Sequence, residues 1–383
     1  MKIGGVRGGQ VFTLSGRTIG TWSPDGTVTH RGQLPHPESG VDTLKNWSRN
    51  SPLIRTLLSQ VVGHFPTGNL WPVGRQSLIA TNTQWVYYSA DDGRSWEAVH
   101  RLPDHSGPMG TLPTAFTELN GNLYLAEYPL HSSPARIIES TDGGETWEPY
   151  CIHESACHFH GVYNDPFGER LWATTGDDDA TSAIGYIDNG EFFPIGYGSQ
   201  QWRAVDLAFT PTSIIWGMDA PYTERIAVLR LRRDDLNGAN PTPEVVTYTD
   251  QAVFYATTTV QHDAYWVVLS TAAESVKDTY VADIDRYQPT PVARVLAASS
   301  ASDFQEWYVM ESYRRNGSLG RWTNYIPEAG AYIFLETGPD GTILLNPYNT
   351  ARDHGTIQQM NLPTVEHGRV QKPTITITET VAD

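Results

Sequence analysis

The sequence is poor in lysine and cysteine, and it has no long apolar segment. Only four of its 26 basic residues are lysines: Lys2, Lys45, Lys277 and Lys372. Its two cysteines are too few for a disulfide framework. No apolar run reaches the roughly 20 residues of a membrane-spanning helix, and the first ten residues contain no apolar signal-peptide core. We therefore expect neither membrane insertion nor a visible secretory signal.

Acidic side chains dominate the charge. The chain has 43 Asp and Glu against 26 Lys and Arg, which gives a formal net charge of −17. Concentrated salt screens the repulsion between such carboxylates, so this balance, together with the scarcity of lysine, favours a protein adapted to high salt. An ordinary acidic secreted protein is the alternative. Nucleic acid is excluded as a partner because no basic patch is present to bind phosphates.

The residues that are abundant indicate an all-β chain. Trp, Tyr, Phe, Thr and Val are frequent, and no long helical pattern is present. Strand-like runs group into units of about 45–50 residues. Six units are clear, and a seventh is expected to combine the two chain ends, which would remove exposed sheet edges. This predicts a β-propeller of four-stranded antiparallel blades, with seven blades favoured and six as the alternative.

Two segments depart from this rhythm. Residues 36–60 form an insertion with a short helix expected over residues 53–60. Residues 365–383 follow the last unit as an extended C-terminal tail, whose alternating pattern is typical of a strand. The domain assignment is therefore one propeller over residues 1–364 and a tail over residues 365–383.

Two octamers, which begin 51 residues apart, share the pattern Ser-x-Asp-x-Gly-x-(Ser/Thr)-Trp. The pattern predicts hairpin turns in which the Asp carboxylate accepts turn N–H groups, the Gly has positive φ and the Trp fills the turn. The positions concerned are Ser89, Asp91, Gly93 and Trp96 in the first octamer, and Ser140, Asp142, Gly144 and Trp147 in the second. The octamers resemble the Asp-box, or bacterial neuraminidase repeat. This resemblance implies a sialidase-like β-propeller in which the boxes stabilise turns at the blade periphery.

The resemblance does not extend to sialidase activity. Sialidases of this family use three arginines, a tyrosine nucleophile, an acid/base aspartate and an Arg-Ile-Pro motif. This chain has no Arg-Ile-Pro, and only Arg203 lies at a suitable position, with Arg75 as a weaker second. The segment 158–177 resembles a segment of propeller-type polysaccharide lyases. This resemblance implies an Arg that neutralises the uronate carboxylate and a His or Tyr that acts as base and acid.

The blade topology predicts one polar site. In an antiparallel blade, the first strand begins at the face where the second strand ends. We therefore expect ten side chains at one mouth of the central channel: His158, His160, Asp177, Asp178, Trp202, Arg203, Asp219, Tyr222, Tyr255 and Glu274. This mixture of aromatic, cationic and carboxylate groups suits sugars. If the protein is an enzyme, the expected catalytic residues are His158, His160, Arg203 and Tyr255.

Metal binding is an open alternative and no cofactor is required. Cys151, His153 and Cys157 lie close in sequence to His158 and His160, and thiolates with imidazoles can bind zinc. The other interpretations are a local disulfide between Cys151 and Cys157, or two buried thiols. The run Asp177–Asp179 offers carboxylates of the kind that bind calcium.

The sequence favours a glycan-recognising propeller on the surface of a haloarchaeal virus particle, as a fibre, turret or tail protein that binds a receptor. The expected partners are a cell-surface glycan or glycoprotein, further copies of the chain, and other virion proteins through residues 365–383. The expected location is the virion surface or the extracellular medium at high salt. A polysaccharide lyase or glycosidase acting on acidic glycans is the main alternative, and a purely structural scaffold is another.

Overall fold

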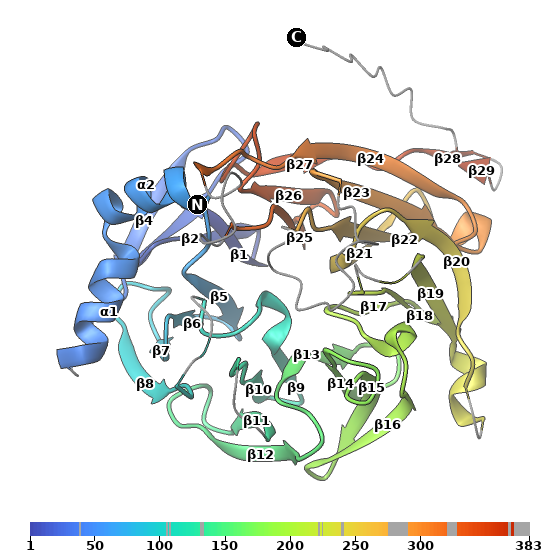
Figure 1. Ribbon diagram of the computed structural model, residues 1–383, viewed down its shortest axis with the longest axis horizontal. Coiled ribbons are helices and arrows are strands. Elements are labelled where there is room, and N and C mark those ends of the chain that lie inside the picture. Colours follow the sequence, from blue (N-terminus) through green and yellow to red (C-terminus); the bar gives the residue numbers. More distant parts are fainter. Residues whose placement is uncertain are drawn as a thin grey trace.

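Seven antiparallel sheets, or blades, surround a central axis in the computed structural model (Figure 1). The structure describes all residues except 38–39, 105, 107–108, 131–133, 221–222, 224, 239–240, 275–289, 320–327, 367–368 and 371–383. The strands of blades 1 to 3 are β1 (Lys2–Arg7), β2 (Gln10–Ser15), β3 (Thr18–Trp22) and β4 (Val28–Gln33); β5 (Gly68–Val73), β6 (Ser77–Asn82), β7 (Trp85–Ser89) and β8 (Glu97–Arg101); β9 (Phe116–Leu119), β10 (Asn122–Ala126), β11 (Ala135–Ser140) and β12 (Glu148–His153).

Blades 4 to 7 follow in the same order along the chain. Their strands are β13 (Phe159–Asp165), β14 (Arg170–Thr175), β15 (Ala183–Asp188) and β16 (Glu191–Tyr197); β17 (Ala208–Phe209), β18 (Ser213–Gly217), β19 (Ile226–Arg232) and β20 (Glu244–Thr249); β21 (Val253–Gln261), β22 (Ala264–Thr271), β23 (Val292–Ser299) and β24 (Trp307–Arg314); β25 (Tyr332–Thr337), β26 (Ile343–Tyr348) and β27 (Gln358–Met360). The predicted seven-bladed all-β propeller of four-stranded antiparallel sheets is thus confirmed, with three strands described in blade 7.

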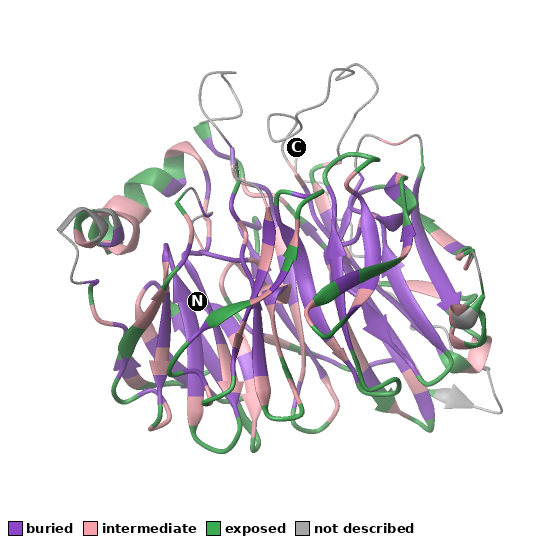
Figure 2. Cartoon of the chain, turned by 90° about the horizontal axis from the view of Figure 1, so that it is seen from below, coloured by how far each residue is buried: buried purple, intermediate pink, exposed green. Residues whose placement is uncertain are grey.

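Burial within each blade follows from its place between two neighbours (Figure 2). The second strand is almost fully buried in every blade, as in β18, because both of its faces pack on other blades. The fourth strand is an edge and is largely exposed, as in β4 and β16. In each four-stranded blade the register shifts once between the third and fourth strands, a bulge that twists the outer edge.

Both octamers form the expected turns between the third and fourth strands of their blades. In the second octamer, Asp142 Oδ1 accepts the backbone N–H groups of Glu145 and Thr146 at 3.0 Å each. Trp147 Nε1 donates to the carbonyl of Gly144 at 3.1 Å. The first octamer repeats the pattern with Asp91, Ser95 and Trp96. Gly93 and Gly144 have φ of +84° and +111°, and both Trp rings are buried.

Each octamer also packs against the preceding blade. A Cβ on Gly144 would lie 2.3 Å from Ile79 Cδ1 of blade 2, and one on Gly93 would lie 3.3 Å from Ile19 Cγ2 of blade 1. These glycines are therefore needed for close approach as well as for positive φ. The turns stabilise the seams between blades as well as their own hairpins.

The ring closes differently from the sequence prediction. The expected seventh blade made from both chain ends is wrong for the described residues, because β1–β4 form a complete blade and β25–β27 pair only with one another. The first and last blades meet instead through Asn346, whose Oδ1 accepts the N–H of Ile3 at 2.9 Å. Apolar packing completes the seam: Ile3, Phe334 and Tyr348 share one buried cluster.

Two helices, α1 (Gly40–Asn50) and α2 (Pro52–Val61), fill the insertion after blade 1. The second helix covers the residues 53–60 where a helix was predicted, while the first was not foreseen. Polar side chains fix α1 to blade 2: Asn46 and Asn50 donate to Asn82 Oδ1 at 2.8 and 2.9 Å. No helix among the described residues is long and apolar enough to cross a membrane.

The C-terminal segment begins with the short strands β28 (Val365–Glu366) and β29 (Arg369–Val370), which pair with each other. Residues 371–383 of the expected tail lie outside the described residues. The partner contacts expected through this segment remain a prediction.

Candidate functional site

The connectivity gathers polar side chains at the face where the innermost strands begin, which we call the upper face (upward in Figure 2). Six of these side chains come from blades 3 to 5 and form what we call the mouth cluster: Tyr128, His158, His160, Asp177, Arg203 and Asp219. Tyr128 follows β10, the histidines lie at the start of β13, and Asp177 follows β14. Arg203 precedes β17 and Asp219 follows β18. Five of the six were predicted to share this face.

Asp177 is at the centre of the mouth cluster. Its Oδ2 lies 3.5 Å from His158 Nε2, and its Oδ1 lies 3.8 Å from His160 Nε2 and 3.7 Å from Arg203 Nη2. The Asp177 side chain is 57% exposed, whereas both histidines are buried. The cluster is therefore open to solvent through a carboxylate.

Backbone carbonyls orient the two imidazoles. His158 Nδ1 lies 3.0 Å from the carbonyl oxygen of Pro129, and His160 Nδ1 lies 3.1 Å from that of Ala204. A carbonyl oxygen only accepts, so Nδ1 is the protonated nitrogen in each ring. Both Nε2 atoms thereby face Asp177.

Burial and charge set the protonation states of the cluster. Burial, and after it the charge of His160, lower the pKa of His158 to about 4, so His158 is neutral at neutral pH. Burial raises the pKa of Asp177, but the adjacent histidines and Arg203 outweigh this and lower it overall. Burial raises the pKa of Asp219 even though its carboxylate lies 3.2 Å from Arg203 Nη2.

Tyr128 was not predicted from the sequence. Its ring centroid lies 4.1 Å from that of His158, and burial, with the charges of Asp177 and Asp219, raises its pKa. It follows the end of β10, the position that drew attention to Asp177 and Asp219 in the next two blades. The same rule, applied to the end of the second strand of blade 3, would therefore have identified Tyr128.

Several other predicted site residues are not part of the mouth cluster. Trp202 is not at the mouth: it is buried in the core and stacks on Trp216 with ring centroids 5.5 Å apart. The reason is local, because Trp202 ends the 3₁₀ turn η2 (Gln200–Trp202) and packs over Gly196, where a Cβ would lie 2.2 Å from the indole. Asp178 closes its own turn by accepting the N–H of Thr181 at 2.9 Å.

Three further predicted residues have different outcomes. Tyr255 is buried, packs with its ring centroid 5.0 Å from that of Phe334, and lines the central channel. The backbone carbonyl of Glu274 accepts Arg315 Nη1 at 2.9 Å. Tyr222 lies outside the described residues.

The cysteines do not form the expected zinc set. Cys151 is a buried free thiol in β12 whose pKa burial raises to about 11, and Cys157 is free and exposed. The ring of His153 packs against Phe192, with centroids 5.1 Å apart. Among the described residues, the one group of three side chains close enough to share an ion is His158, His160 and Asp177. The alternatives of a disulfide and of two buried thiols are also wrong.

The central channel contains a second group of titratable side chains. A cavity of about 330 Å³ is lined by residues of the innermost strands, among them Lys2, Asp206 and Glu336. Burial raises the pKa of Asp206 and of Glu336 to about 7, and it lowers the pKa of Lys2 to about 7. Asp206 is held by the N–H groups of Leu207 and Ala256 at 2.9 and 2.8 Å.

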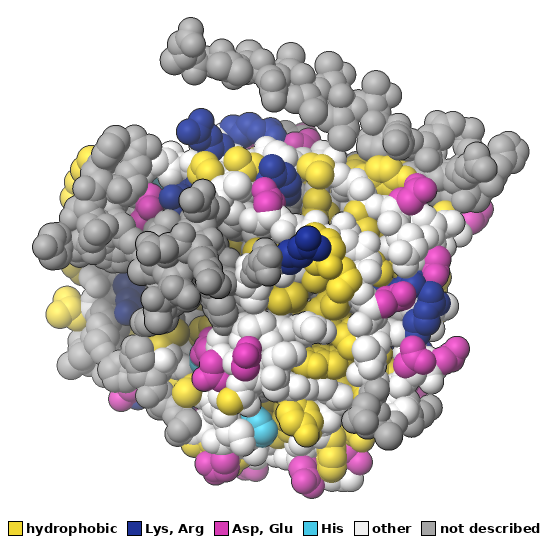
Figure 3. Space-filling view, turned by 45° about the vertical axis from the view of Figure 1, so that its right-hand side comes forward, with side chains coloured by type: hydrophobic (Ala, Val, Ile, Leu, Met, Phe, Trp, Pro, Cys, Tyr) yellow, Lys and Arg dark blue, Asp and Glu magenta, His cyan; other side chains and the backbone are white. Residues whose placement is uncertain are grey.

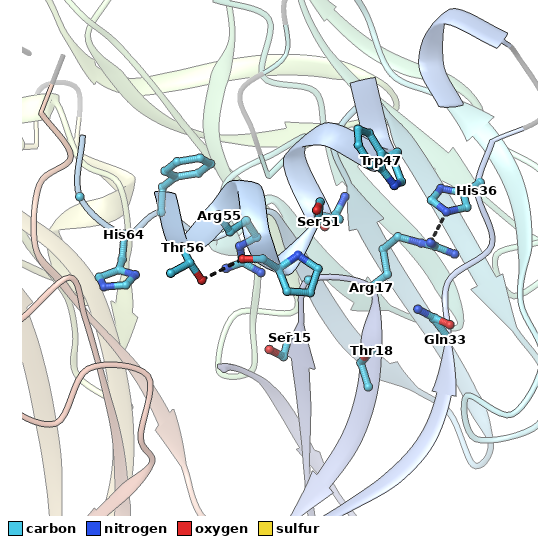
Figure 4. A pocket seen from close by; sticks show the side chains of 15 residues that line it. Ser15, Arg17, Thr18, Gln33, His36, Trp47, Ser51, Arg55, Thr56 and His64 are labelled. Atoms are coloured by element: carbon cyan, nitrogen blue, oxygen red, sulfur yellow. Dashed lines mark hydrogen bonds between the residues drawn. The ribbon is translucent and has the colours of Figure 1, made fainter. Parts of the chain in front are cut away.

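A cavity lies beside the inserted helices, and we call it the helical pocket (Figure 4). It has a volume of about 530 Å³ between α1, α2 and the upper end of blade 1. Its lining is Ser15, Gly16, Arg17, Thr18, Gln33, His36, Trp47, Asn50, Ser51, Pro52, Arg55, Thr56, Gly63, His64 and Phe65. Two arginines and two histidines contribute, and none of the lining residues is Asp or Glu.

The cationic groups of the helical pocket are fixed in place. Arg17 Nε donates to the carbonyl of Leu34 at 2.8 Å, and its Nη1 bonds His36 Nε2. Arg55 Nη2 donates to Tyr348 Oη at 3.2 Å. Burial, and then the charge of Arg55, lower the pKa of His64. Sequence reasoning missed this pocket, although the insertion that interrupts the blade rhythm was a visible signal of function.

The comparisons with known proteins assign no family to the chain. No family model matches the chain, and no curated protein matches it. A Thermus thermophilus oxidoreductase described as a glucose dehydrogenase has 13% identity and a TM-score of 0.43, covering 70% of this chain and 89% of its own. The Escherichia coli soluble aldose sugar dehydrogenase has 12% identity and a TM-score of 0.43, covering 70% and 92%.

A Fusarium graminearum α-L-arabinofuranosidase has 14% identity and a TM-score of 0.44, covering 78% of this chain and 92% of its own. Such values concern the fold and carry no inference about activity. No family model matches the Asp-box resemblance of the octamers. The chain is a seven-bladed β-propeller, and its likeness to these solved structures is distant.

Proposed function

We propose that this protein is a carbohydrate-recognition module for acidic sugars, and that the helical pocket is its binding site. The observation that carries the proposal is charge: in a chain of net charge −17, the residues lining a 530 Å³ cavity include Arg17 and Arg55 but no carboxylate. The acidic surface of the protein would repel an acidic glycan, so a local cationic cavity both binds the glycan and determines where on the protein it binds.

The remaining lining suits a sugar ring. Trp47 is 52% exposed at the pocket and offers an apolar ring face. Ser, Thr, Asn and Gln side chains supply hydroxyl and amide groups that can bond sugar hydroxyls. The volume is within the range of small-molecule sites, about 300–1,000 Å³.

The test is binding of a matched pair of probes: a glucuronate oligomer and the neutral glucose oligomer of the same length, titrated by calorimetry. Arg55→Gln should lower the affinity for the acidic oligomer by about 10–100-fold, which corresponds to one charge-assisted hydrogen bond. It should leave the affinity for the neutral oligomer unchanged. Trp47→Ala should weaken both probes. Arg75→Gln is the control, because it removes the same charge from the turn between β5 and β6 on the opposite face.

Two results would contradict the proposal. One is equal affinity of the native protein for the acidic and neutral oligomers. The other is the same loss from Arg75→Gln as from Arg55→Gln, which would indicate net charge and no specific site.

A second candidate is an enzyme, a lyase or glycosidase acting on acidic glycans at the mouth cluster. The contact of the tilted Tyr128 and His158 rings, with Arg203 near the same Asp177, favours it, because a lyase needs a base, an acid and a cation for the uronate. It predicts an unsaturated uronate product that is lost in Tyr128→Phe. Absence of product from a panel of uronate polymers at high salt would remove it.

We further propose that the module acts on the surface of a virus particle in a high-salt environment, as one of several copies. The support is compositional: 43 acidic residues and only four lysines. Acidic side chains recur over the face in Figure 3. Mass spectrometry of purified virus particles tests this location. Absence of the protein from particles of the virus that encodes it would refute the proposed location and leave the proposal on sugar binding untouched.

A further inference from the structure

We propose that the mouth cluster contains a binding site for a first-row divalent metal ion of the zinc type, with His158 Nε2, His160 Nε2 and a carboxylate oxygen of Asp177 as ligands. This inference is independent of the carbohydrate proposal, which concerns the helical pocket. It also differs from the sequence prediction, which placed zinc on the cysteines.

The distances already approach those of a metal site. The three ligand atoms lie within 4.8 Å of one another, and the two nitrogen–oxygen distances are 3.5 and 3.8 Å. Ligands bound about 2.0 Å from a tetrahedral ion are roughly 3.3 Å apart. The two nitrogen–oxygen distances involve different oxygens of Asp177, so rotation of this exposed side chain and adjustment of the two imidazoles would close the remaining gaps when an ion binds.

The orientation of the imidazoles is the second observation. Both Nδ1 atoms lie at hydrogen-bond distance from backbone carbonyls, of Pro129 and Ala204, so both Nε2 atoms are the ones that face Asp177. This is the outer-shell contact that typically fixes a metal-binding histidine. His158 Nε2 is buried without a hydrogen-bond partner among the described residues, a polar atom that the surrounding protein leaves unsatisfied.

The charge balance permits a cation. Arg203 Nη2 lies 3.7 Å from Asp177 Oδ1 but only 3.2 Å from Asp219 Oδ2. The carboxylate of Asp219 therefore offsets the positive charge of Arg203.

The ligand types select the metal. Two imidazoles and one carboxylate suit zinc and its neighbours in the first transition row, whereas calcium prefers six to eight oxygen ligands. Asp178 is occupied with its own turn, so the carboxylate run at 177–179 does not supply such a set. Three protein ligands leave coordination positions open towards the exposed side of Asp177.

The experiment titrates the metal-free full-length protein with Zn²⁺ by calorimetry and with Co²⁺ by visible absorption. We expect one ion per chain, and a Co²⁺ spectrum with nitrogen and oxygen ligands and no thiolate band. Asp177→Asn should lower the affinity for Zn²⁺ by at least about 10-fold, and His160→Gln should lower it by at least about 100-fold. Loss of even an outer-shell partner lowers metal affinity by about 10–100-fold. Ca²⁺ should not compete.

Two matched controls make the test specific. Asp179→Asn removes the same charge from an exposed neighbour, and Cys157→Ser removes the exposed thiol. Both should bind Zn²⁺ within 2-fold of the native protein. Because Asp177 is exposed, its variant should fold, as circular dichroism would verify, even if the buried histidine variants do not.

The proposal is overturned if the native protein binds no Zn²⁺ below millimolar concentration. It is also overturned if Asp179→Asn weakens Zn²⁺ as much as Asp177→Asn does, or if Cys157→Ser abolishes binding. None of these results bears on sugar binding at the helical pocket, so the two proposals fail separately.

Discussion

A buried ion pair between blades 4 and 5 gives a quantitative test of how the ring is held together. Asp165, at the end of β13, is 1% exposed and accepts Arg233 Nη1 and Nη2 at 2.7 Å each. Arg233 also donates through Nε to the carbonyl of Thr210 at 2.7 Å. We consider the change Arg233→Met, which keeps the length of the side chain and removes its charge and donors.

The variant leaves the Asp165 carboxylate buried without its cation. Breaking a buried pair in this way costs about 3–5 kcal/mol. Unfolding entropy of about 2.1 cal/mol/K per residue gives roughly 0.8 kcal/mol/K for 383 residues. The expected fall in Tm is therefore about 4–6 °C, measured by differential scanning calorimetry at fixed salt.

The control is the exposed pair between Arg101 and Asp104, whose side chains are 42% and 65% exposed. Arg101→Met should lower Tm by no more than about 1 °C, because exposed pairs contribute about 0–1 kcal/mol. Adding Asp165→Asn to Arg233→Met should restore part of the loss, since it removes the unpaired charge. Equal effects of Arg233→Met and Arg101→Met would refute the reasoning.

Two further predictions concern the central channel and the octamer turns. Burial raises the pKa values of Asp206 and Glu336 from 3.8 and 4.5 to about 7. Between these values the folded protein therefore binds protons that the unfolded chain has lost. The contribution of the two carboxyl groups to the free energy of unfolding should fall as pH rises from about 4 to about 7. Asp206→Asn with Glu336→Gln should flatten Tm between pH 5 and 8 and raise it at pH 8, and an unchanged pH slope would contradict this. Gly144→Ala should lower Tm more than Gly143→Ala, because both glycines have positive φ but only the Cβ at 144 meets Ile79 Cδ1, at 2.3 Å. Ile79→Val should recover part of the Gly144→Ala loss, and equal losses from the two glycine variants would exclude the packing explanation.

The repeat rhythm was readable in the sequence because each blade is a local unit. Strands that are neighbours in the chain are neighbours in the sheet, so turn residues and alternating side chains report the pairing directly. The octamers show this: their bonds join Asp142 to residues only two to four positions away. Closure was predicted wrongly because it depends on contacts such as Ile3 with Asn346, which no local pattern encodes.

The candidate site was partly accessible for a related reason. Antiparallel connectivity alone puts the start of one strand and the end of the next on the same face, which is how His158, His160 and Asp177 came to be considered together. It does not determine whether a side chain then faces the mouth or the core. The 3₁₀ turn before Arg203 and the bare backbone of Gly196 direct Trp202 inward, and these are matters of packing.

The sequence by itself determined the all-β class, the blade-length repeat, the octamer turns and the acidic character of the chain, since each is expressed in composition or in short-range patterns. Only the tertiary structure decided which side chains meet. It directed two imidazoles at one carboxylate by means of carbonyls from distant loops, and it placed Arg17 and Arg55 around a cavity that neither segment forms alone. The physical reason is that these sites depend on the packing of blades and helices against one another, where contacts join residues far apart in the chain.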